Sequence, residues 1–495
     1  MGFTNKNKAL PIPESNDEEF EFYHVFEPTN VKAVVHSITN SLKKDKNINI
    51  EYLFLPFRKE QTNENLLRFL NAIFPLGNGK PINNVTKIDK IIEKTKGDIL
   101  FQALKYIWCR LPGTSGIVGW RAYNLFKEKE AELRFPQRAF LEIMPKNLES
   151  PDHASLVYDF FDLIVTMSSN ANKNKLSARK ISRMCALWAF PCENSSIAGS
   201  SSSSSSSPSA TSFYNGNDLD FSTGVSNNAL PNNSFQEGLK EWIPASNAMF
   251  HLTMSFIKSF LPEAGDMSEN FPKTLQHVLQ DNEYPPEENS WITSSSTILQ
   301  VPLISLQTTE FSRKPWDLIK RLNDLLCSHD PEIEAGFDNI PKQDYMVLKN
   351  LFKTSSSSNS KVVENISKKM SKQSKKLMKE MTTKHSTFQA GWASNRKCLP
   401  VSTMNPSKDY LKTGICEIDD YFIWTWMSSI SNEQTSMKRK IFGRSLILEF
   451  EFDGFKKWVI FEECDSTIEL LKNKNISNGQ KSSSKRKIVS KKTNV

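Results

Sequence analysis

The stretch ALKYIWCRLP at residues 103–112 decides the character of the first half of the chain. It lies in a very apolar segment that predicts a helix over residues 99–111, closed by Pro112, whose ring cannot continue a helix. Working outward, apolar residues recur at helical spacing on both sides of it. These further segments are residues 31–42, 66–73, 140–144, 153–167, 177–190 and 235–260. The first half of the chain is therefore expected to be mostly α.

A segment rich in Ser, Asn and Gly interrupts this helical pattern at about residues 193–234 and includes a run of eight serines at 200–207. Such a segment buries too little apolar area to offset its chain entropy, so it is predicted to be disordered. Apolar residues at helical spacing occur on both sides of this segment. We therefore expect an insertion inside one domain that covers residues 19–275. The polar residues 1–18 are predicted to be disordered as well.

The second half, residues 276–470, has a different hydrophobic pattern, with segments typical of strands as well as helices. Residues 297–306 are apolar and typical of a strand, and residues 316–326 predict an amphipathic helix. Alternating residues on both sides of the pair Asp453-Gly454 predict a tight β-hairpin over residues 445–462. The aromatic string at residues 421–426 is predicted to be buried, because so much exposed aromatic area is unfavourable. The fold class is therefore α+β, an all-α domain followed by a smaller α+β region.

Positive charge is concentrated in two segments. Residues 471–495 hold eight Lys or Arg and no acidic residue, which equals the net charge of +8 of the whole chain. A second basic segment, predicted as one helix over residues 361–384, has eight Lys against two Glu and an apolar stripe. Both are candidates for contact with anionic lipid. For the helix, the alternative is a connecting helix with a solvated lysine face. For the tail, the alternatives are a nuclear-import-like patch and a solubilising end. The candidate membrane-binding residues are Lys368, Lys372, Lys376, Lys485, Arg486 and Lys487.

Sequence signals for catalysis, metals and cofactors are absent. Residues 77–80 (GNGK) lack the spacing of a phosphate-binding loop, and no serine-hydrolase, zinc-protease or kinase pattern occurs. The seven His and seven Cys are scattered without ligand spacing, which predicts reduced thiols, no metal and no cofactor. Asp419-Asp420 is interpreted as a helix cap. With no signal peptide or apolar span, a cytoplasmic protein is expected, and the charge pattern of the folded part gives no reason to expect nucleic acid.

Several segments, taken in order, resemble the helical domain of Rho GTPase-activating proteins. Residues 103–112 resemble its helix that ends in a Leu-Pro turn, and residues 120–126 stand at the spacing of its next helix. The other matching segments are residues 51–55, 140–145, 156–164 and 174–177. The resemblance implies an all-α fold and a Rho-family small GTPase as partner. An unrelated helical bundle is the alternative.

The catalytic positions of that family are where this sequence departs from it. The family inserts an arginine that stabilises charge on the transferred phosphoryl group, and Leu55 stands at the corresponding position, with Arg58 nearby. Lys105 matches the supporting lysine of the family. Cys109 replaces its helical arginine, with Arg110 one place away, and Lys180 replaces its asparagine. The resemblance therefore implies a GTPase-binding module without efficient catalysis, with Lys105, Arg110, Lys180 and Arg58 as candidate GTPase-binding residues. A slow activating enzyme that uses Arg58 or Arg110 is the alternative.

Longer strings resemble a family of fungal morphogenesis-related proteins, the multicopy suppressors of bud emergence. The matching segments are residues 18–22, 75–79, 104–112, 177–182, 241–246, 311–316, 383–388, 419–426 and 441–461. This resemblance implies a polarity factor that acts with Rho-family GTPases and polarity scaffold proteins. Its expected location is the cytoplasm and the cell cortex at the bud site, bud tip and bud neck. A cortical membrane adaptor without GTPase contact is a further alternative.

Overall fold

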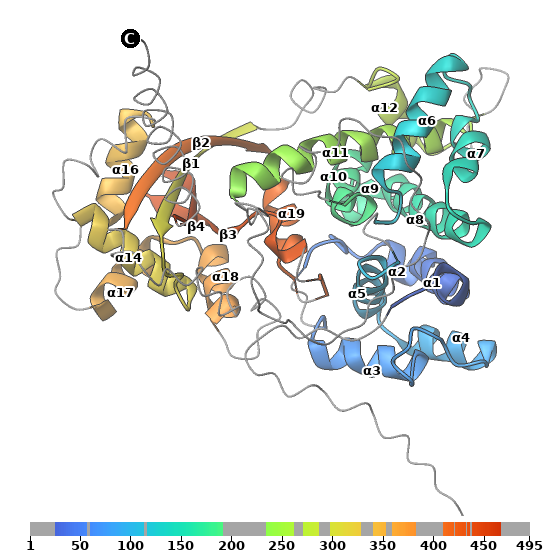
Figure 1. Ribbon diagram of the computed structural model, residues 1–495, viewed down its shortest axis with the longest axis horizontal. Helices are drawn as coiled ribbons and strands as arrows, with labels where there is room; N and C mark the ends of the chain where they lie inside the picture. The colour runs from blue at the N-terminus through green and yellow to red at the C-terminus, as the bar shows by residue number, and fades with distance from the viewer. Residues whose placement is uncertain are drawn as a thin grey trace, which may run out of the picture.

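The computed structural model places a group of helices, from residues 25–286, beside a small sheet with its own helices, from residues 298–466 (Figure 1). The described residues are 25–56, 60–112, 116–191, 234–261, 271–286, 298–327, 340–352, 359–382, 409–419, 421–431, 433–435 and 438–466. The combination of mostly helical structure with one sheet confirms the α+β fold class. The predictions for residues 1–18, for the serine segment and for residues 471–495 lie outside the described residues.

The first group consists of helices, as predicted. Its elements are α1 (Pro28–Lys43), α2 (Asp45–Ile48), α3 (Asn63–Ile73), α4 (Val85–Lys94), α5 (Gly97–Trp108), α6 (Trp120–Glu132), α7 (Ala139–Ile143), the 3-10 helix η1 (Met144–Asn147), α8 (Pro151–Ser169), α9 (Ala171–Asn174), α10 (Ala178–Ala189), α11 (Phe235–Lys258) and α12 (Lys273–Gln280). In α1 the predicted apolar face is buried and packs against α8, which the hydroxyl of Ser150 caps by accepting from the backbone N–H of His153.

Helices α10 and α11 come from the two sides of the serine segment and pack against each other. Helix α11 begins with a capping box, in which the hydroxyl of Ser234 accepts from the backbone N–H of Glu237 at 3.2 Å and the Glu237 carboxylate accepts from the backbone N–H of Ser234 at 3.3 Å. The hydroxyls of Ser182 on α10 and Thr253 on α11 lie 2.9 Å apart. The pairing of these two helices places both flanks of the insertion in one packed unit.

The second group contains a four-stranded sheet of order β2-β1-β4-β3. Its elements are β1 (Ile298–Thr308), α14 (Pro315–Cys327), α16 (Lys342–Phe352), α17 (Asn359–Lys369), α18 (Lys372–Thr382), β2 (Tyr410–Asp419), α19 (Phe422–Ser429), the 3-10 helix η3 (Lys438–Lys440), β3 (Arg444–Phe452) and β4 (Phe455–Asp465). Strand β1 is antiparallel to β2 and parallel to β4. The predicted hairpin is confirmed, since β3 and β4 pair up to Phe452 and Phe455 around Gly454, whose φ is +88°.

The basic segment predicted as one helix over residues 361–384 is two helices, so that prediction was wrong. Helix α17 ends before Met370, which forms a β-bridge with Phe450 of β3, and the N–H of Ser371 donates to the carbonyl of Glu449 at 2.9 Å. Backbone pairing with the sheet edge therefore breaks the helix. The apolar stripe, including Ile366 and Met381, is buried against the protein. It is not free to enter a membrane.

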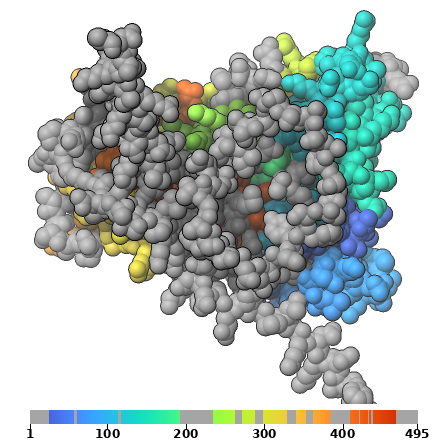
Figure 2. Space-filling view, in the orientation of Figure 1, coloured from blue at the N-terminus to red at the C-terminus, as the bar shows by residue number. Residues whose placement is uncertain are grey.

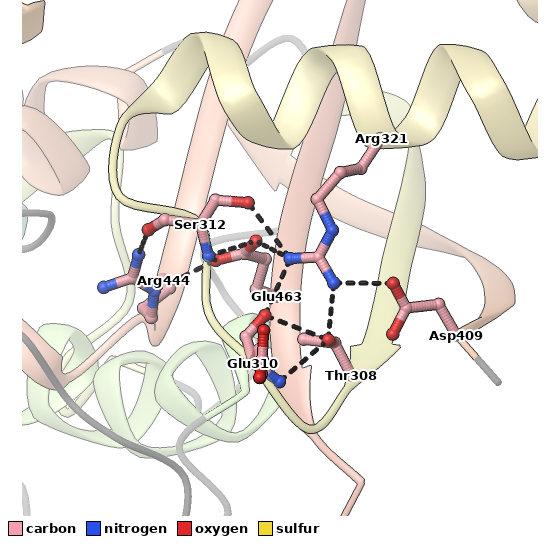
Figure 3. A network of polar contacts seen from close by, with 7 residues as sticks. All are labelled: Thr308, Glu310, Ser312, Arg321, Asp409, Arg444 and Glu463. Carbon is pink, nitrogen blue, oxygen red and sulfur yellow. Dashed lines mark hydrogen bonds and ion pairs between the residues drawn. The ribbon is translucent and has the colours of Figure 1, made fainter. Parts of the chain in front are cut away.

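A network of charged and polar side chains fixes the connection between β1 and α14 to strands β3 and β4 (Figure 3). The carboxylate of Glu463 on β4 is fully buried and accepts from Arg321 of α14 at 3.2 Å and from Arg444 of β3 at 3.1 Å. The backbone N–H of Ser312 also donates to this carboxylate, and Arg321 reaches Asp409 at 2.6 Å. Two cations around one buried carboxylate satisfy its charge, so the network holds elements together.

Candidate functional site

Helix α5 carries one charged residue deep in the protein. Lys105 has no exposed surface, because the helix is apolar and covered on nearly every side. A lone ammonium in such surroundings needs a counter-charge. It has one in the carboxylate of Glu433, whose side chain is 2% exposed and which follows α19. The lysine predicted to face a GTPase is therefore engaged inside the chain.

The C-terminal end of α5 meets the same segment. The thiol of Cys109 donates to the side-chain carbonyl of Gln434 at 2.9 Å, and Arg110 donates to the backbone carbonyl of Glu433 at 2.6 Å. The Arg110 guanidinium also lies 3.7 Å from the ring centre of Tyr106. Burial raises the pKa of the Cys109 thiol, which keeps it protonated and unreactive.

Helix α10 contacts the C-terminal region through its basic side chains. Arg183 forms a buried ion pair with Asp419 at the end of β2, and the ammonium of Lys180 lies 4.1 Å from the ring centre of Tyr421. Burial, with the nearby charge of Arg183, lowers the pKa of Arg179 to about 10. The interpretation of Asp419-Asp420 as a helix cap was wrong for Asp419, and Asp420 lies outside the described residues. The N-cap of α19 is Tyr421, which makes no capping bond, and Asp419 instead neutralises Arg183.

Aromatic packing surrounds these polar contacts. The ring of Phe422 lies edge-on to Trp242 of α11 at 4.9 Å, to Phe235 at 5.6 Å and to Phe442 at 5.0 Å between ring centres. This confirms that the aromatic string at residues 421–426 is mainly buried. We call this contact zone the junction. It consists of Lys105, Cys109, Arg110, Lys180 and Arg183 on the helical side and Asp419, Tyr421, Phe422, Glu433 and Gln434 on the other.

The junction brings together three of the four candidate GTPase-binding residues. Lys105 and Arg110 both contact Glu433, and Lys180 contacts Tyr421. Leu55 is half-buried and packs against the core, while Arg58 lies outside the described residues. Sequence reasoning missed Glu433 and Gln434, and nothing in their local sequence distinguishes them. Every basic group of the junction has a partner within the chain. The junction therefore holds the helical region and the C-terminal region together.

A second buried cluster joins a carboxylate, an imidazole and two phenols. The carboxylate of Glu130 on α6 lies 2.9 Å from Nε2 of His251 on α11 and accepts from the hydroxyl of Tyr284, and the hydroxyl of Tyr123 lies 3.3 Å from Nδ1 of His251. Glu130 is fully buried and His251 is 3% exposed. A substrate cannot reach these groups without unpacking α6 from α11. We therefore interpret the cluster as part of the core, in which the buried polar groups satisfy one another by hydrogen bonds.

The described part of the chain holds no group of three or more His, Cys, Asp or Glu that could bind a metal ion. None of its helices combines the length and the hydrophobicity that crossing a bilayer requires. Of the candidate membrane-binding residues, Lys368, Lys372 and Lys376 are exposed on α17 and α18, whereas Lys485, Arg486 and Lys487 lie outside the described residues.

Comparison with known proteins finds a family and two relatives. A family model described as "Meiotically up-regulated protein Msb1/Mug8 domain" matches residues 25–464. A Saccharomyces cerevisiae protein, "Morphogenesis-related protein MSB1", is 49% identical over 481 residues, which cover 94% of this chain and 39% of that protein. A Schizosaccharomyces pombe protein, "Meiotically up-regulated gene 8 protein", is 22% identical over 192 residues, 38% of this chain and 21% of that protein. The chain thus spans well under half the length of either relative. No solved structure matches it.

Proposed function

The chain belongs to the Msb1/Mug8 domain family, and we propose that it is a cell-polarity and morphogenesis factor that acts by binding other proteins and not by catalysis. Its Saccharomyces cerevisiae relative is a morphogenesis-related protein, which supports the role in morphogenesis. Under this proposal the chain scaffolds Rho-family GTPase signalling together with polarity proteins. It works in the cytoplasm and at the cell cortex, at the bud site, bud tip and bud neck.

One observation carries the non-catalytic part of the proposal. A GTPase-activating domain accelerates hydrolysis by placing a free arginine against the transferred phosphoryl group. Arg110 is held by the backbone carbonyl of Glu433 and by the ring of Tyr106, and Lys105 is held by the carboxylate of Glu433. Releasing Lys105 would leave the buried carboxylate of Glu433 without its partner, which is strongly unfavourable, and releasing Arg110 would break its hydrogen bond to the backbone of Glu433. These residues therefore serve the protein's own cohesion.

Single-turnover GTP hydrolysis tests this directly. A Rho-type GTPase loaded with GTP is mixed with the full chain, with the Arg58→Ala variant, or with buffer. We expect the hydrolysis rate to stay within about twofold of the intrinsic rate, far below the factor of about 10³ or more that an arginine finger supplies. An acceleration above about tenfold that Arg58→Ala abolishes would overturn the non-catalytic proposal and favour the slow activating enzyme.

Capture on immobilised GTPase tests the scaffold part. Rho-type GTPases loaded with GTP or GDP are presented to the full chain, and retention is compared with that on a bare matrix. The scaffold proposal expects retention that depends on the nucleotide. Because the ring of Tyr421 engages Lys180 within the junction, Lys180→Ala should leave retention unchanged. Lys87→Glu on the exposed face of α4 is the control and should leave it unchanged as well. No retention in either nucleotide state would contradict GTPase scaffolding.

The exposed lysines of α17 and α18 favour a second candidate, a cortical adaptor that binds anionic membrane without a GTPase. Lys361 and Lys375 are exposed along with Lys368, Lys372 and Lys376, and the apolar stripe beneath them is buried. Such a surface would attract lipid headgroups by charge alone. This candidate becomes the first choice if the GTPase capture fails and vesicle binding succeeds.

A further inference from the structure

Two tight turns of the helical region meet at a strained backbone position. One turn, residues 49–55, follows α2 and contains Tyr52, and the other, residues 172–177, joins α9 to α10 and contains Lys175. The φ angles of these two residues are +54° and +66°, so both are left-handed without being glycine. The backbone N–H of Tyr52 donates to the carbonyl of Asn174 at 2.8 Å, which holds the turns together. For a bulky aromatic residue this conformation is an unfavourable outlier.

A buried asparagine enforces this geometry. The side-chain amide of Asn174 donates to the carbonyl of Ile48 on α2 at 3.1 Å and to that of Met167 on α8 at 2.8 Å. Its side-chain oxygen accepts from the backbone N–H of Leu176 at 2.9 Å. Strained residues persist only where their surroundings fix them in this way, and such positions are concentrated at functional sites. The turns are therefore a candidate for a function outside the core.

The strain at Tyr52 exposes its side chain. Tyr52 is 40% exposed, whereas the next two residues, Leu53 and Phe54, are fully buried. Phe135 also has a positive φ, but its ring packs against Tyr284, with 6.1 Å between the ring centres. The rigid turn at Tyr52 instead presents an aromatic ring to solvent. Tyrosine is one of the residues that contribute most to binding energy at protein interfaces.

The charge beside this ring is mainly positive. Lys173 and Lys175 stand on either side of Asn174, and both are exposed and make no ion pair with any described residue. Glu51 is the one acidic residue in the two turns, and it already has an interaction within the chain. Two ammonium groups against one engaged carboxylate leave an excess of positive charge, which complements an acidic partner.

We propose that the two turns form a docking site for a short acidic segment of a partner protein. The segment packs apolar side chains on the ring of Tyr52 and places its carboxylates against Lys173 and Lys175. Because the turn is already fixed, the ring meets its partner without a further loss of loop entropy, which favours binding. This surface goes beyond the proposed function, because it contains none of the candidate GTPase-binding residues and requires no membrane.

Peptide selection on the full chain tests the proposal. A random-peptide display library is selected on the wild-type protein, and the enriched peptides are synthesised and titrated by fluorescence anisotropy. We expect acidic peptides that also carry apolar residues. Tyr52→Asn removes the ring and keeps a residue that tolerates positive φ. This variant, and the combined Lys173→Glu and Lys175→Glu variant, should each raise the dissociation constant at least about tenfold.

Matched controls come from α8 and α4. Tyr158 on α8 is 42% exposed, and Lys87 and Lys90 are exposed on α4, in the light-blue lobe at the lower right of Figure 2. Tyr158→Asn, and Lys87→Glu combined with Lys90→Glu, should leave the dissociation constant unchanged. Tyr52→Asn should melt no lower than Tyr158→Asn, because asparagine suits a left-handed turn better than a helix interior.

Three outcomes would overturn the proposal. The first is that no acidic peptide is enriched. The second is that the enriched peptides bind Tyr52→Asn and the double lysine variant as tightly as the wild type. The third is that Tyr52→Asn melts well below Tyr158→Asn, which would assign the ring to the stability of the fold.

Discussion

Lys105 on α5 and Glu433 after α19 form an ion pair that is shut off from water, with exposed side-chain fractions of 0% and 2%. The two residues come from the helical region and from the C-terminal region. Their pairing means that the C-terminal region completes the interior of the helical one. Lys105, which the sequence suggests as a GTPase-binding residue, is therefore part of the buried core.

Removing one member of this pair should destabilise the protein strongly. Lys105→Met leaves the Glu433 carboxylate buried without a counter-charge, and we expect the free energy of unfolding to fall by about 3–5 kcal/mol. Lys105→Met combined with Glu433→Gln should recover most of that loss. The exposed pair of Lys32 and Asp152 provides the control, since Lys32→Met should change stability by about 1 kcal/mol or less. Urea unfolding measures all four proteins, and equal stability of Lys105→Met and wild type would contradict the assignment.

Gly238 allows α11 to approach the segment before β3. A Cβ built there would lie 2.1 Å from the carbonyl oxygen of Ile441, which is backbone and cannot move aside easily. Gly238→Ala should therefore lower the free energy of unfolding by about 2 kcal/mol. Gly414→Ala in β2 is the control, because its nearest neighbour is the side chain of Gln236 at 3.4 Å. Thermal melts compare the two, and a Gly238→Ala melt that matches Gly414→Ala would argue against this close contact.

Glu462 on β4 should make stability depend on pH. It accepts from the hydroxyl of Ser305 and from the backbone N–H of Phe235 at 2.8 Å, and burial raises its pKa above the ordinary value of 4.5. The folded protein therefore holds this proton more tightly than the unfolded chain does. Stability from this group is fully present below pH 4.5 and is lost as pH rises through the raised pKa.

Glu462→Gln removes the titrating group and keeps the acceptor. Unfolding free energies of wild type and variant, measured by denaturant at a series of pH values, should diverge as pH rises, with the wild type losing more. The exposed Glu364 on α17, paired with Lys368, is a suitable comparison, and Glu364→Gln should leave the wild-type pH profile above 4.5 unchanged. Parallel profiles for wild type and Glu462→Gln would refute the role given to this carboxyl.

The lysines of α17 and α18 should bind anionic membrane by charge without insertion. Combined Lys368→Glu, Lys372→Glu and Lys376→Glu should weaken flotation with phosphatidylserine-containing vesicles at least about tenfold, since each lysine contributes about 1 kcal/mol. Added salt should weaken wild-type binding in the same way. Lys87→Glu, Lys90→Glu and Lys94→Glu on α4 form the matched triple control, and pure phosphatidylcholine vesicles control for charge.

A chain that lacks residues 471–495 separates the tail from the two helices. If the truncated chain floats as well as the full chain, the tail is not the anchor. If the triple variant on α17 and α18 floats as well as wild type, these lysines do not contribute to membrane binding.

Local sequence was sufficient to predict an element wherever its conformation depends on its own residues. The apolar spacing in α1 and the Asp453-Gly454 turn between β3 and β4 predicted helix and hairpin correctly, because periodicity and turn chemistry act within a few residues. Strand β2 was missed. Its burial alternates irregularly, and its conformation comes from pairing with β1, which lies far away in the sequence.

The sequence by itself determined the fold class, the main helices and the hairpin, because these follow from hydrophobic periodicity and turn residues. Only the tertiary structure decided where the charged residues point. Lysine-rich sequence favours a continuous helix at Met370, yet pairing with Phe450 breaks it. Lys105 looks like a binding residue until Glu433 is placed against it. A buried charge is defined by its partner, and that partner came from a distant part of the chain that folding brought close.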